Sequence, residues 1–196
     1  MTVKTLLQLS GADLTPPRLA DACLIMIDLQ NEYLAGPIAL PDARAATANA
    51  AELLARARQR GSAIFHIAHR GKAGGLFDRA AERGAIIAAV APREGEAVIE
   101  KELPNAFAGT ELQARLAATG RKNIVLAGFM THMCISSTAR AALDLGFRTT
   151  VDADSCATRD LPDGHGGVVT ARALHDIALT ELSDRFAVIA SVGTIT

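Results

Sequence analysis

The sequence predicts an α/β fold in which helices cover both faces of a parallel β-sheet. Short apolar runs alternate along the chain with longer segments that carry apolar residues at helical spacing, and this alternation is typical of βαβ units. Of the 196 residues, 49% are hydrophobic but only 4% are aromatic, so small aliphatic side chains must build the core. A chain of this length fits one domain, and we expect residues 1–196 to form a single one.

Six apolar runs are expected to form the strands of this sheet. They are residues 23–29, 63–69, 97–101, 124–130, 148–153 and 186–192. The first run is interrupted near its carboxyl end by Asp28, whose carboxylate is costly to bury unless it is paired or functional. Because helical segments separate the runs, the strands should be joined by right-handed crossovers and lie parallel.

The helices between the strands are marked by caps and by glycine stops. Asp42 is a candidate cap for the first, and Thr110 with Gln113 forms a possible capping box for the third. The expected helices span residues 43–60, 76–83, 110–119 and 132–145, and a last one follows Gly164–Gly167 and runs to about residue 182. Residues 70–95 are rich in glycine and hold only the short helix, and long loops in compact domains are often functional.

Composition and charge argue against several classes of function. The net charge is −1, with no basic block or acidic tail, which disfavours a nucleic-acid or membrane-surface partner. No apolar run approaches the roughly 20 residues of a membrane span, and residues 1–17 do not read as a signal peptide. Three cysteines give no disulfide framework and suit a reducing compartment. We therefore expect a cytoplasmic protein that acts on a small molecule.

Three reactive side chains fall at or near the carboxyl ends of predicted strands, namely Asp28, Lys101 and Cys134. In an open α/β sheet this edge carries the ligand crevice. A carboxylate beside a thiol can take its proton, and a lysine beside both would stabilise the charges. Cys134 is also expected where a helix begins, and the helix dipole there lowers the pKa of a thiol. Each residue alone has a structural alternative: a strand-end cap, a surface cation or a buried structural cysteine.

Four motifs resemble those of the isochorismatase-like cysteine hydrolase family. They read DLQNEY from Asp28, KELPNAF from Lys101, GFMTHMCISSTARAALDLGF from Gly128 and TVDADSCATRDL from Thr150. The resemblance covers about residues 22–190. It implies a three-layer Rossmann-like fold with a six-stranded parallel sheet in the order 3-2-1-4-5-6. It also implies an Asp-Lys-Cys catalytic triad that maps onto Asp28, Lys101 and Cys134, and a homo-oligomer, either a dimer or a tetramer.

The resemblance extends to the surroundings of the nucleophile. It implies a cis peptide between Phe129 and Met130, and an oxyanion hole made by the backbone N–H groups of Met130 and Cys134. The polar and aromatic groups expected nearest to this site, as candidates for binding substrate, are Tyr33, His69, Asn105, Phe107, Phe129 and His132, although Phe129 equally suits the core. His165 is expected in a loop, His175 on a helix surface, and Cys23 and Cys156 in buried positions.

The presence of Cys134 bears on the reaction. Family members that cleave the vinyl ether of isochorismate often lack the cysteine, so its presence favours hydrolysis of an amide or carbamoyl C–N bond through a thioester. Nicotinamidase members carry a metal site built from Asp-x-His and a further histidine. This chain has no Asp-x-His after its first strand, and His66 and His69 should point to opposite faces of their strand. We therefore expect no metal, no other cofactor, and a substrate other than nicotinamide.

Two alternatives to this reaction stay open. The first is a hydrolase that acts on an enol ether with Asp28 as its base and forms no covalent intermediate. The second is a binding or thiol-redox protein that uses Cys134 and Cys156, which would leave Asp28 and Lys101 without a role.

Overall fold

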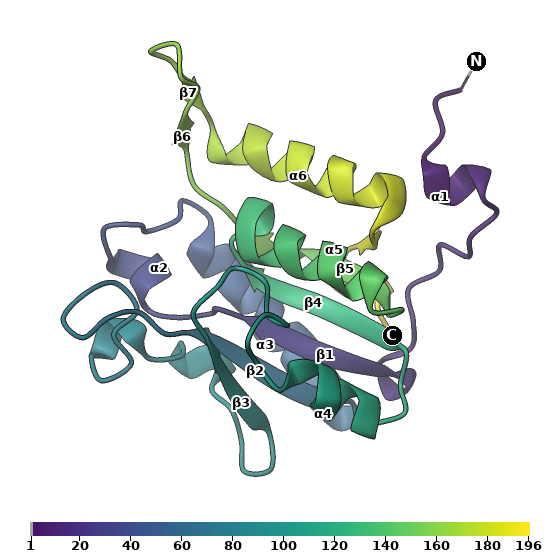
Figure 1. Cartoon of the computed structure of the whole chain (residues 1–196), viewed down its shortest axis with the longest axis horizontal. Coiled ribbons are helices and arrows are strands. Elements are labelled where there is room, and N and C mark those ends of the chain that lie inside the picture. Colours follow the sequence, from purple (N-terminus) through teal and green to yellow (C-terminus); the bar gives the residue numbers. More distant parts are fainter. Residues whose placement is uncertain (1) are drawn as a thin grey trace.

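The computed structural model describes residues 2–196 and has the expected three layers, with α4, α5 and α6 in front of the central sheet and α3 behind it (Figure 1). The six strands of the sheet are all parallel and lie in the order β3-β2-β1-β4-β5-β8. They are β1 (Ala22–Ile27), β2 (Ala63–His69), β3 (Ala97–Lys101), β4 (Asn123–Phe129), β5 (Arg148–Ala157) and β8 (Val188–Ala190). Because β8 is the sixth strand of this sheet along the chain, the expected order is confirmed.

The remaining elements surround the sheet. The helices are α1 (Leu6–Leu9), α2 (Glu32–Ala35), α3 (Ala43–Gln59), α4 (Leu112–Ala118), α5 (Ser136–Asp144) and α6 (Ala171–Arg185). A π-helical turn, Thr131–Ile135, precedes α5, and short 3-10 turns lie at Leu19–Asp21, Glu82–Gly84, Ala88–Val90 and Val192–Thr194. The strands β6 (Leu161–Pro162) and β7 (Val168–Val169) form an antiparallel hairpin that projects from the body beside α6 (Figure 1).

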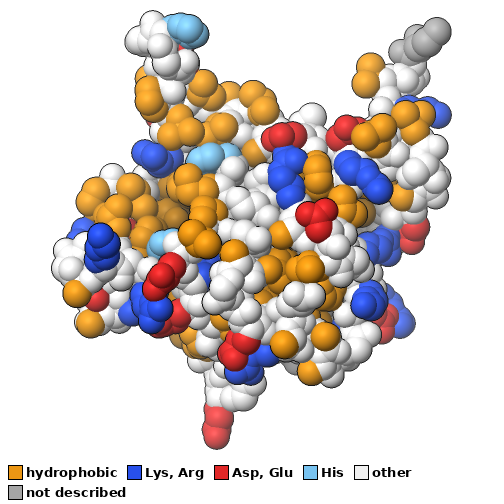
Figure 2. All heavy atoms as spheres, viewed as in Figure 1, with side chains coloured by type: hydrophobic (Ala, Val, Ile, Leu, Met, Phe, Trp, Pro, Cys, Tyr) orange, Lys and Arg blue, Asp and Glu red, His pale blue; other side chains and the backbone are white. Residues whose placement is uncertain are grey.

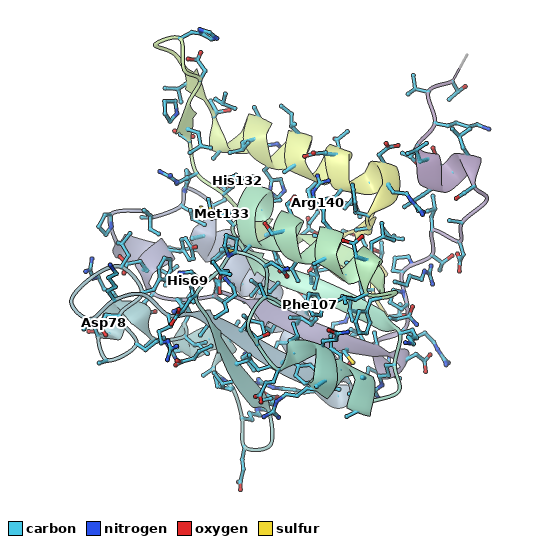
Figure 3. All side chains as sticks on the ribbon, viewed as in Figure 1. His69, Asp78, Phe107, His132, Met133 and Arg140 are labelled. Carbon is cyan, nitrogen blue, oxygen red and sulfur yellow. The ribbon has the colours of Figure 1, made fainter. Side chains whose placement is uncertain are left out.

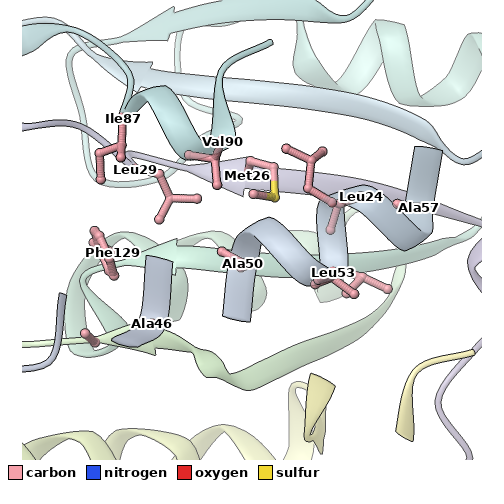
Figure 4. Close-up of a cluster of buried hydrophobic side chains, with 14 of the residues drawn as sticks. Leu24, Met26, Leu29, Ala46, Ala50, Leu53, Ala57, Ile87, Val90 and Phe129 are labelled. Carbon is pink, nitrogen blue, oxygen red and sulfur yellow. The ribbon is translucent and has the colours of Figure 1, made fainter. Parts of the chain in front are cut away.

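The core is divided by the sheet into two clusters. Successive residues of a strand face opposite sides, so Leu24 and Met26 pack against α3 while Ile25 packs toward the opposite face. Figure 4 shows Leu53 of α3 among the buried side chains on the α3 face. Burial of a leucine of this kind stabilises the fold by about 1.5–3 kcal/mol. This packing holds the carboxyl ends of β1 and β4 in register at Ile27 and Gly128.

The short helix expected over residues 76–83 is not formed. Phe77 adopts a φ of +57°, which a right-handed helix cannot accommodate. Asp78 accepts hydrogen bonds from the N–H groups of Gly74 and Ala80 at 2.7 and 2.9 Å. Hydrogen bonds from backbone N–H groups to a nearby side chain replace the backbone hydrogen bonds of a helix, so the segment is a folded loop.

Other expected boundaries shift by a few residues. Asp42 makes no capping hydrogen bond to α3, and Thr110 accepts from Leu112 N at 3.3 Å instead of forming the capping box. β5 runs four residues beyond the expected end because a register shift between Leu126 and Gly128 lets it continue along β4. In the described residues, no helix is long and apolar enough to cross a membrane.

Candidate active site

The fold brings Asp28, Lys101 and Cys134 together at the carboxyl edge of the sheet. Asp28 follows β1 directly, Lys101 is the last residue of β3, and Cys134 lies in the π-helical turn after β4. β1 and β4 are neighbours, whereas β2 separates β1 from β3. The long side chain of Lys101 therefore has to reach past the end of β2 to meet Asp28.

Lys101 is the centre of the cluster. Its Nζ lies 2.7 Å from Asp28 Oδ2, and both side chains are fully buried. The same Nζ lies 3.4 Å from Cys134 Sγ and 3.3 Å from His69 Nδ1. An ammonium group has three donors and no acceptor, so these partners use all of them. Because Lys101 can only donate, Nδ1 of His69 must accept the hydrogen bond from Lys101 Nζ. The proton of the neutral imidazole is therefore on Nε2.

The protonation of Cys134 differs from the expectation. Burial, together with the negative charge of Asp28, raises the pKa of the Cys134 thiol to about 12, and Lys101 opposes this only in part. The expected lowering by the helix terminus is therefore wrong for the resting site, because the thiol is withdrawn from water beside a carboxylate. Burial also raises the pKa of the Asp28 carboxyl against the opposing effect of Lys101. The thiol is thus neutral at rest, with a strengthened base beside it.

Gln30, two residues beyond Asp28, holds the neighbouring strand in place. Its Oε1 accepts from His69 N at 2.8 Å, and its Nε2 donates to the carbonyls of His69 and Gly84 at 3.0 and 2.8 Å. The side chain is fully buried. Sequence reasoning missed this residue, although a buried amide directly after an apolar strand is a usable signal, because such a group must find partners.

Glu32 was also missed, and it anchors the loop that contains Phe77 and Arg83. The side chain is fully buried, with Oε2 accepting from Phe77 N at 3.2 Å and Oε1 3.2 Å from Arg83 Nη1. The Phe77 ring lies 5.2 Å from that of Tyr33 and 5.0 Å from that of His69. Figure 2 shows apolar side chains gathered over α2 and the neighbouring loops on this side of the molecule.

The six candidate binding residues occupy different places. His69 touches Lys101, and the buried ring of Tyr33 lies 5.4 Å from Phe129, which is fully buried in the core. His132 bonds through Nδ1 to Thr158 Oγ1 at 2.5 Å.

Asn105 and Phe107 have local partners. Asn105 Oδ1 accepts from Phe107 N at 2.9 Å, and the Phe107 ring stacks on Phe147 at 5.9 Å. Figure 3 shows His69 and His132 on one side of the molecule and Phe107 toward its middle.

The turn that carries Cys134 has a cis peptide between Phe129 and Met130, as expected. The oxyanion hole formed by Met130 and Cys134 stays a prediction. His175 is half-buried instead of lying on an open helix surface, because its Nδ1 bonds to Thr131 Oγ1 at 2.9 Å. This bond links α6 to the first residue of the turn.

Within residues 2–196, no group of three or more histidine, cysteine or acidic side chains is arranged to hold a metal ion. His66 bonds to Glu96 at 2.9 Å, and Arg58 binds the same carboxylate at 2.7 and 2.8 Å. His66 therefore belongs to an ion-pair cluster, separate from the contact between His69 and Lys101.

An apolar cavity of about 420 Å³ lies elsewhere in the fold. Among the residues that line it are Leu143 near the end of α5, Phe147 directly before β5, and Val188 at the start of β8. These positions are at the amino edge of the sheet, so the cavity is separate from the Asp28, Lys101 and Cys134 cluster.

Comparison with known proteins agrees with this geometry. The family model described as the isochorismatase domain matches residues 22–194. A secreted isochorismatase effector of Verticillium dahliae is 37% identical over 180 residues, which cover 90% of this chain and 92% of the effector. The crystal structure of an isochorismatase from Pseudomonas putida KT2440 is 40% identical, with a TM-score of 0.95 and full coverage of both chains. Maleamate amidohydrolase of Pseudomonas putida is 34% identical over 75% of this chain and 82% of its own.

Proposed function

The chain belongs to the isochorismatase family of hydrolases, and on that basis we propose that it hydrolyses a C–N bond of a small amide or carbamoyl compound through its Cys134 thiol. The observation that carries the proposal is the position of Lys101 Nζ, 2.7 Å from Asp28 and 3.4 Å from Cys134 in a buried cluster. An acid–base pair beside a thiol is the arrangement that nucleophilic catalysis requires. Maleamate amidohydrolase, a relative that the chain matches over most of its length, is named for cleavage of an amide.

The proposed reaction begins with proton transfer. Asp28 accepts the thiol proton as the sulfur of Cys134 attacks the substrate carbonyl carbon, which gives a tetrahedral intermediate. Backbone N–H groups of Met130 and Cys134 hold its oxyanion, and Lys101 balances the charge that passes between thiol and carboxylate. Asp28 then returns the proton to the leaving amine as the C–N bond breaks. Water, deprotonated by Asp28, hydrolyses the thioester and restores the thiol.

The neutral state of the thiol supports this order of events. Since the pKa of Cys134 is raised to about 12, very little thiolate is present before substrate binds. Proton transfer to Asp28 must therefore accompany attack, and the raised pKa of the Asp28 carboxyl makes it a better acceptor.

The test is a screen of ammonia release from small primary amides and carbamoyl compounds, and of hydrazine release from hydrazides, with wild type beside Cys134→Ala. Lactams need a direct product assay because ring opening releases no ammonia. We expect activity in the wild type only, and a thioester adduct on Cys134 in mass spectra taken during turnover. Full activity in Cys134→Ala would overturn the proposal.

Hydrolysis of an enol ether without a covalent intermediate is a second candidate. It is supported by the names of two relatives, the effector from Verticillium dahliae and the structure from Pseudomonas putida, both called isochorismatases. In that reaction Asp28 would act as the base and Cys134 would be dispensable. Turnover of an enol ether by both wild type and Cys134→Ala would favour this candidate, and an acyl adduct on Cys134 would exclude it.

A further inference from the structure

The apolar cavity at the amino edge of the sheet has the size of a ligand site. Its volume is about 420 Å³, and its inner wall includes Leu143 of α5, Phe147 before β5 and Phe186 after α6. Small-molecule sites in proteins are commonly apolar cavities of about 300–1,000 Å³. Since an apolar cavity of about 150 Å³ binds benzene, this one has room for a molecule of roughly 12–16 non-hydrogen atoms.

The outer wall of the cavity is the N-terminal segment, residues 6–14. Leu7 and Leu14 line the cavity from this side. The helix of the segment, α1, has no buried residue and lies beside the C-terminal end of α6 (Figure 1). The cavity is therefore closed on this side by a single layer of chain and not by the core.

Polar contacts hold this outer wall against the body of the molecule. The N–H of Leu6 donates to Asp184 Oδ1 at 2.8 Å. Arg148 Nη2 donates to the carbonyls of Asp13 and Thr15 at 2.7 Å each. A segment with few buried apolar contacts opens at a low cost in free energy, which gives a ligand a way into the cavity.

A buried hydroxyl without a partner lies in the cavity wall. Thr149, the second residue of β5, lines the cavity and is 3% exposed. Its Oγ1 is buried and has no hydrogen-bond partner among residues 2–196. A buried polar group without a partner is destabilising, so a ligand with a polar end would remove this cost.

The rim of the cavity carries more positive than negative charge. Arg185, the last residue of α6, lines the cavity and has neither a hydrogen-bond nor an ion-pair partner within the described chain. Arg148 also lines it and uses only Nη2 in its side-chain contacts, so its Nε and Nη1 are without partners among residues 2–196. Asp13 is the acidic residue of the lining, and its carboxylate already accepts from Thr15 N at 2.9 Å and lies 3.4 Å from Arg148.

We propose that this cavity binds a monocarboxylate with an apolar tail, of the size of a medium-chain fatty acid. The tail packs against the leucine and phenylalanine side chains of the walls. The carboxylate lies at the rim, where Arg185 and the free N–H groups of Arg148 donate to it, because charge-assisted hydrogen bonds from a guanidinium favour this group. The volume is too small for a lipid with two acyl chains, and the charge of the rim disfavours an alkylammonium ion.

This proposal does not depend on the proposed function, because the cavity and Cys134 lie at opposite edges of the sheet. It is tested by isothermal titration calorimetry of the full chain with decanoate and with decan-1-ol, its neutral counterpart. The variants are Ala12→Trp, which fills the cavity from its outer wall, and Arg185→Gln, which removes a charge of the rim. Arg44→Gln is the matched control, since Arg44 is an exposed arginine near the start of α3, at the opposite edge of the sheet.

We expect one decanoate to bind per chain, with a Kd of roughly 100 µM or below. Ala12→Trp should weaken binding of both compounds at least tenfold. Arg185→Gln should weaken decanoate about three- to tenfold and leave decan-1-ol unchanged, since a charge-assisted hydrogen bond at an exposed rim is lost. Arg44→Gln should bind both as wild type does, and circular dichroism checks that each variant is folded. Absence of binding to wild type, or unchanged binding of decanoate in folded Ala12→Trp or in folded Arg185→Gln, would overturn the proposal.

Two controls establish where decanoate binds. The rate of Cys134 alkylation by iodoacetamide should be the same with and without saturating decanoate. Protection of Cys134 that persists in Ala12→Trp would place decanoate at the catalytic edge and would overturn the proposal. Size-exclusion chromatography with light scattering gives the oligomeric state of wild type and Ala12→Trp. A wild-type dimer that Ala12→Trp converts to a monomer, without binding of decanoate to wild type, would make the cavity an interface between two copies and would also overturn the proposal.

Discussion

Replacement of Lys101 by methionine tests the buried cluster most directly. Methionine has a similar length but no charge, so Lys101→Met leaves Asp28 buried without its counter-ion. Both side chains are fully buried and 2.7 Å apart. Removal of one partner of a buried ion pair costs about 3–5 kcal/mol, which is a large part of a total stability of about 5–15 kcal/mol.

The expected loss can be measured by thermal or urea denaturation. For a chain of this size each kcal/mol changes Tm by about 2–4 °C, so Lys101→Met should lower Tm by roughly 6–20 °C. The double variant Asp28→Asn with Lys101→Met removes both charges and should recover most of the loss. A Tm within about 2 °C of wild type in the single variant, which is less than 1 kcal/mol, would refute the reasoning.

The loss in Lys101→Met should also depend on pH. Burial raises the pKa of Asp28 in the folded state, and removal of Lys101 raises it further, so the folded state binds a proton at a pH where the unfolded state does not. The destabilisation is therefore fully present above the folded-state pKa and is lost as pH falls toward the unfolded-state value. Lys101→Met should be closer to wild type at pH 5 than at pH 8, and an equal loss at both would contradict this.

Three further predictions concern single residues. The pKa of about 12 for Cys134 means that its alkylation by iodoacetamide should still rise with pH above 9, and a plateau below pH 7 would show a preformed thiolate. Burial raises the pKa of Asp152 to about 6, so ionisation of this carboxyl destabilises the folded state above that pH. In urea denaturation, Asp152→Asn should therefore raise the free energy of unfolding by up to about 3 kcal/mol at pH 7.5 and by much less at pH 4.5. Equal gains at the two pH values would contradict this. Gly128→Ala would place its Cβ 1.9 Å from Ile27 O at a φ of +129°, so this variant should not fold. In the control Gly120→Ala the new Cβ meets no atom within 4 Å, and this variant should fold. Circular dichroism measures both, and a folded Gly128→Ala would refute the clash.

The sheet was predictable because its strands are buried on both faces and therefore appear as nearly unbroken apolar runs. The bounds of β2 and β3 were expected as the structure has them. The order of the strands came from the resemblance of four motifs to a known family, since periodicity does not determine which strands are neighbours.

The loop from residue 70 to residue 95 could not be predicted, because long-range contacts determine its shape. Phe77 reaches a positive φ while its N–H is held by Glu32, 45 residues earlier in the chain. Local propensity carries no information about such a partner, and tertiary contacts override it.

The candidate site was predictable by residue type but not by protonation. Asp28 and Lys101 were identified from the sequence because they lie at the carboxyl ends of predicted strands. The pKa of Cys134 could not be predicted in this way, because it depends on the burial of the thiol and on its distance from Asp28, which only the structure supplies. Whether the chain forms a homo-oligomer and whether it is cytoplasmic stay predictions, and the relative from Verticillium dahliae is named as secreted.

The neutral, buried thiol of Cys134 has a consequence for the chemical durability of the protein. Peroxides and disulfides react with the thiolate form of cysteine, and an inaccessible protonated thiol reacts slowly with both. Cys134 is 4% exposed and has a pKa near 12, so oxidants meet almost no reactive sulfur at rest. In the proposed reaction, the sulfur becomes reactive only when a substrate carbonyl is present and Asp28 takes the proton. A nucleophile held in this way should keep its function under oxidative stress that inactivates enzymes with preformed thiolates.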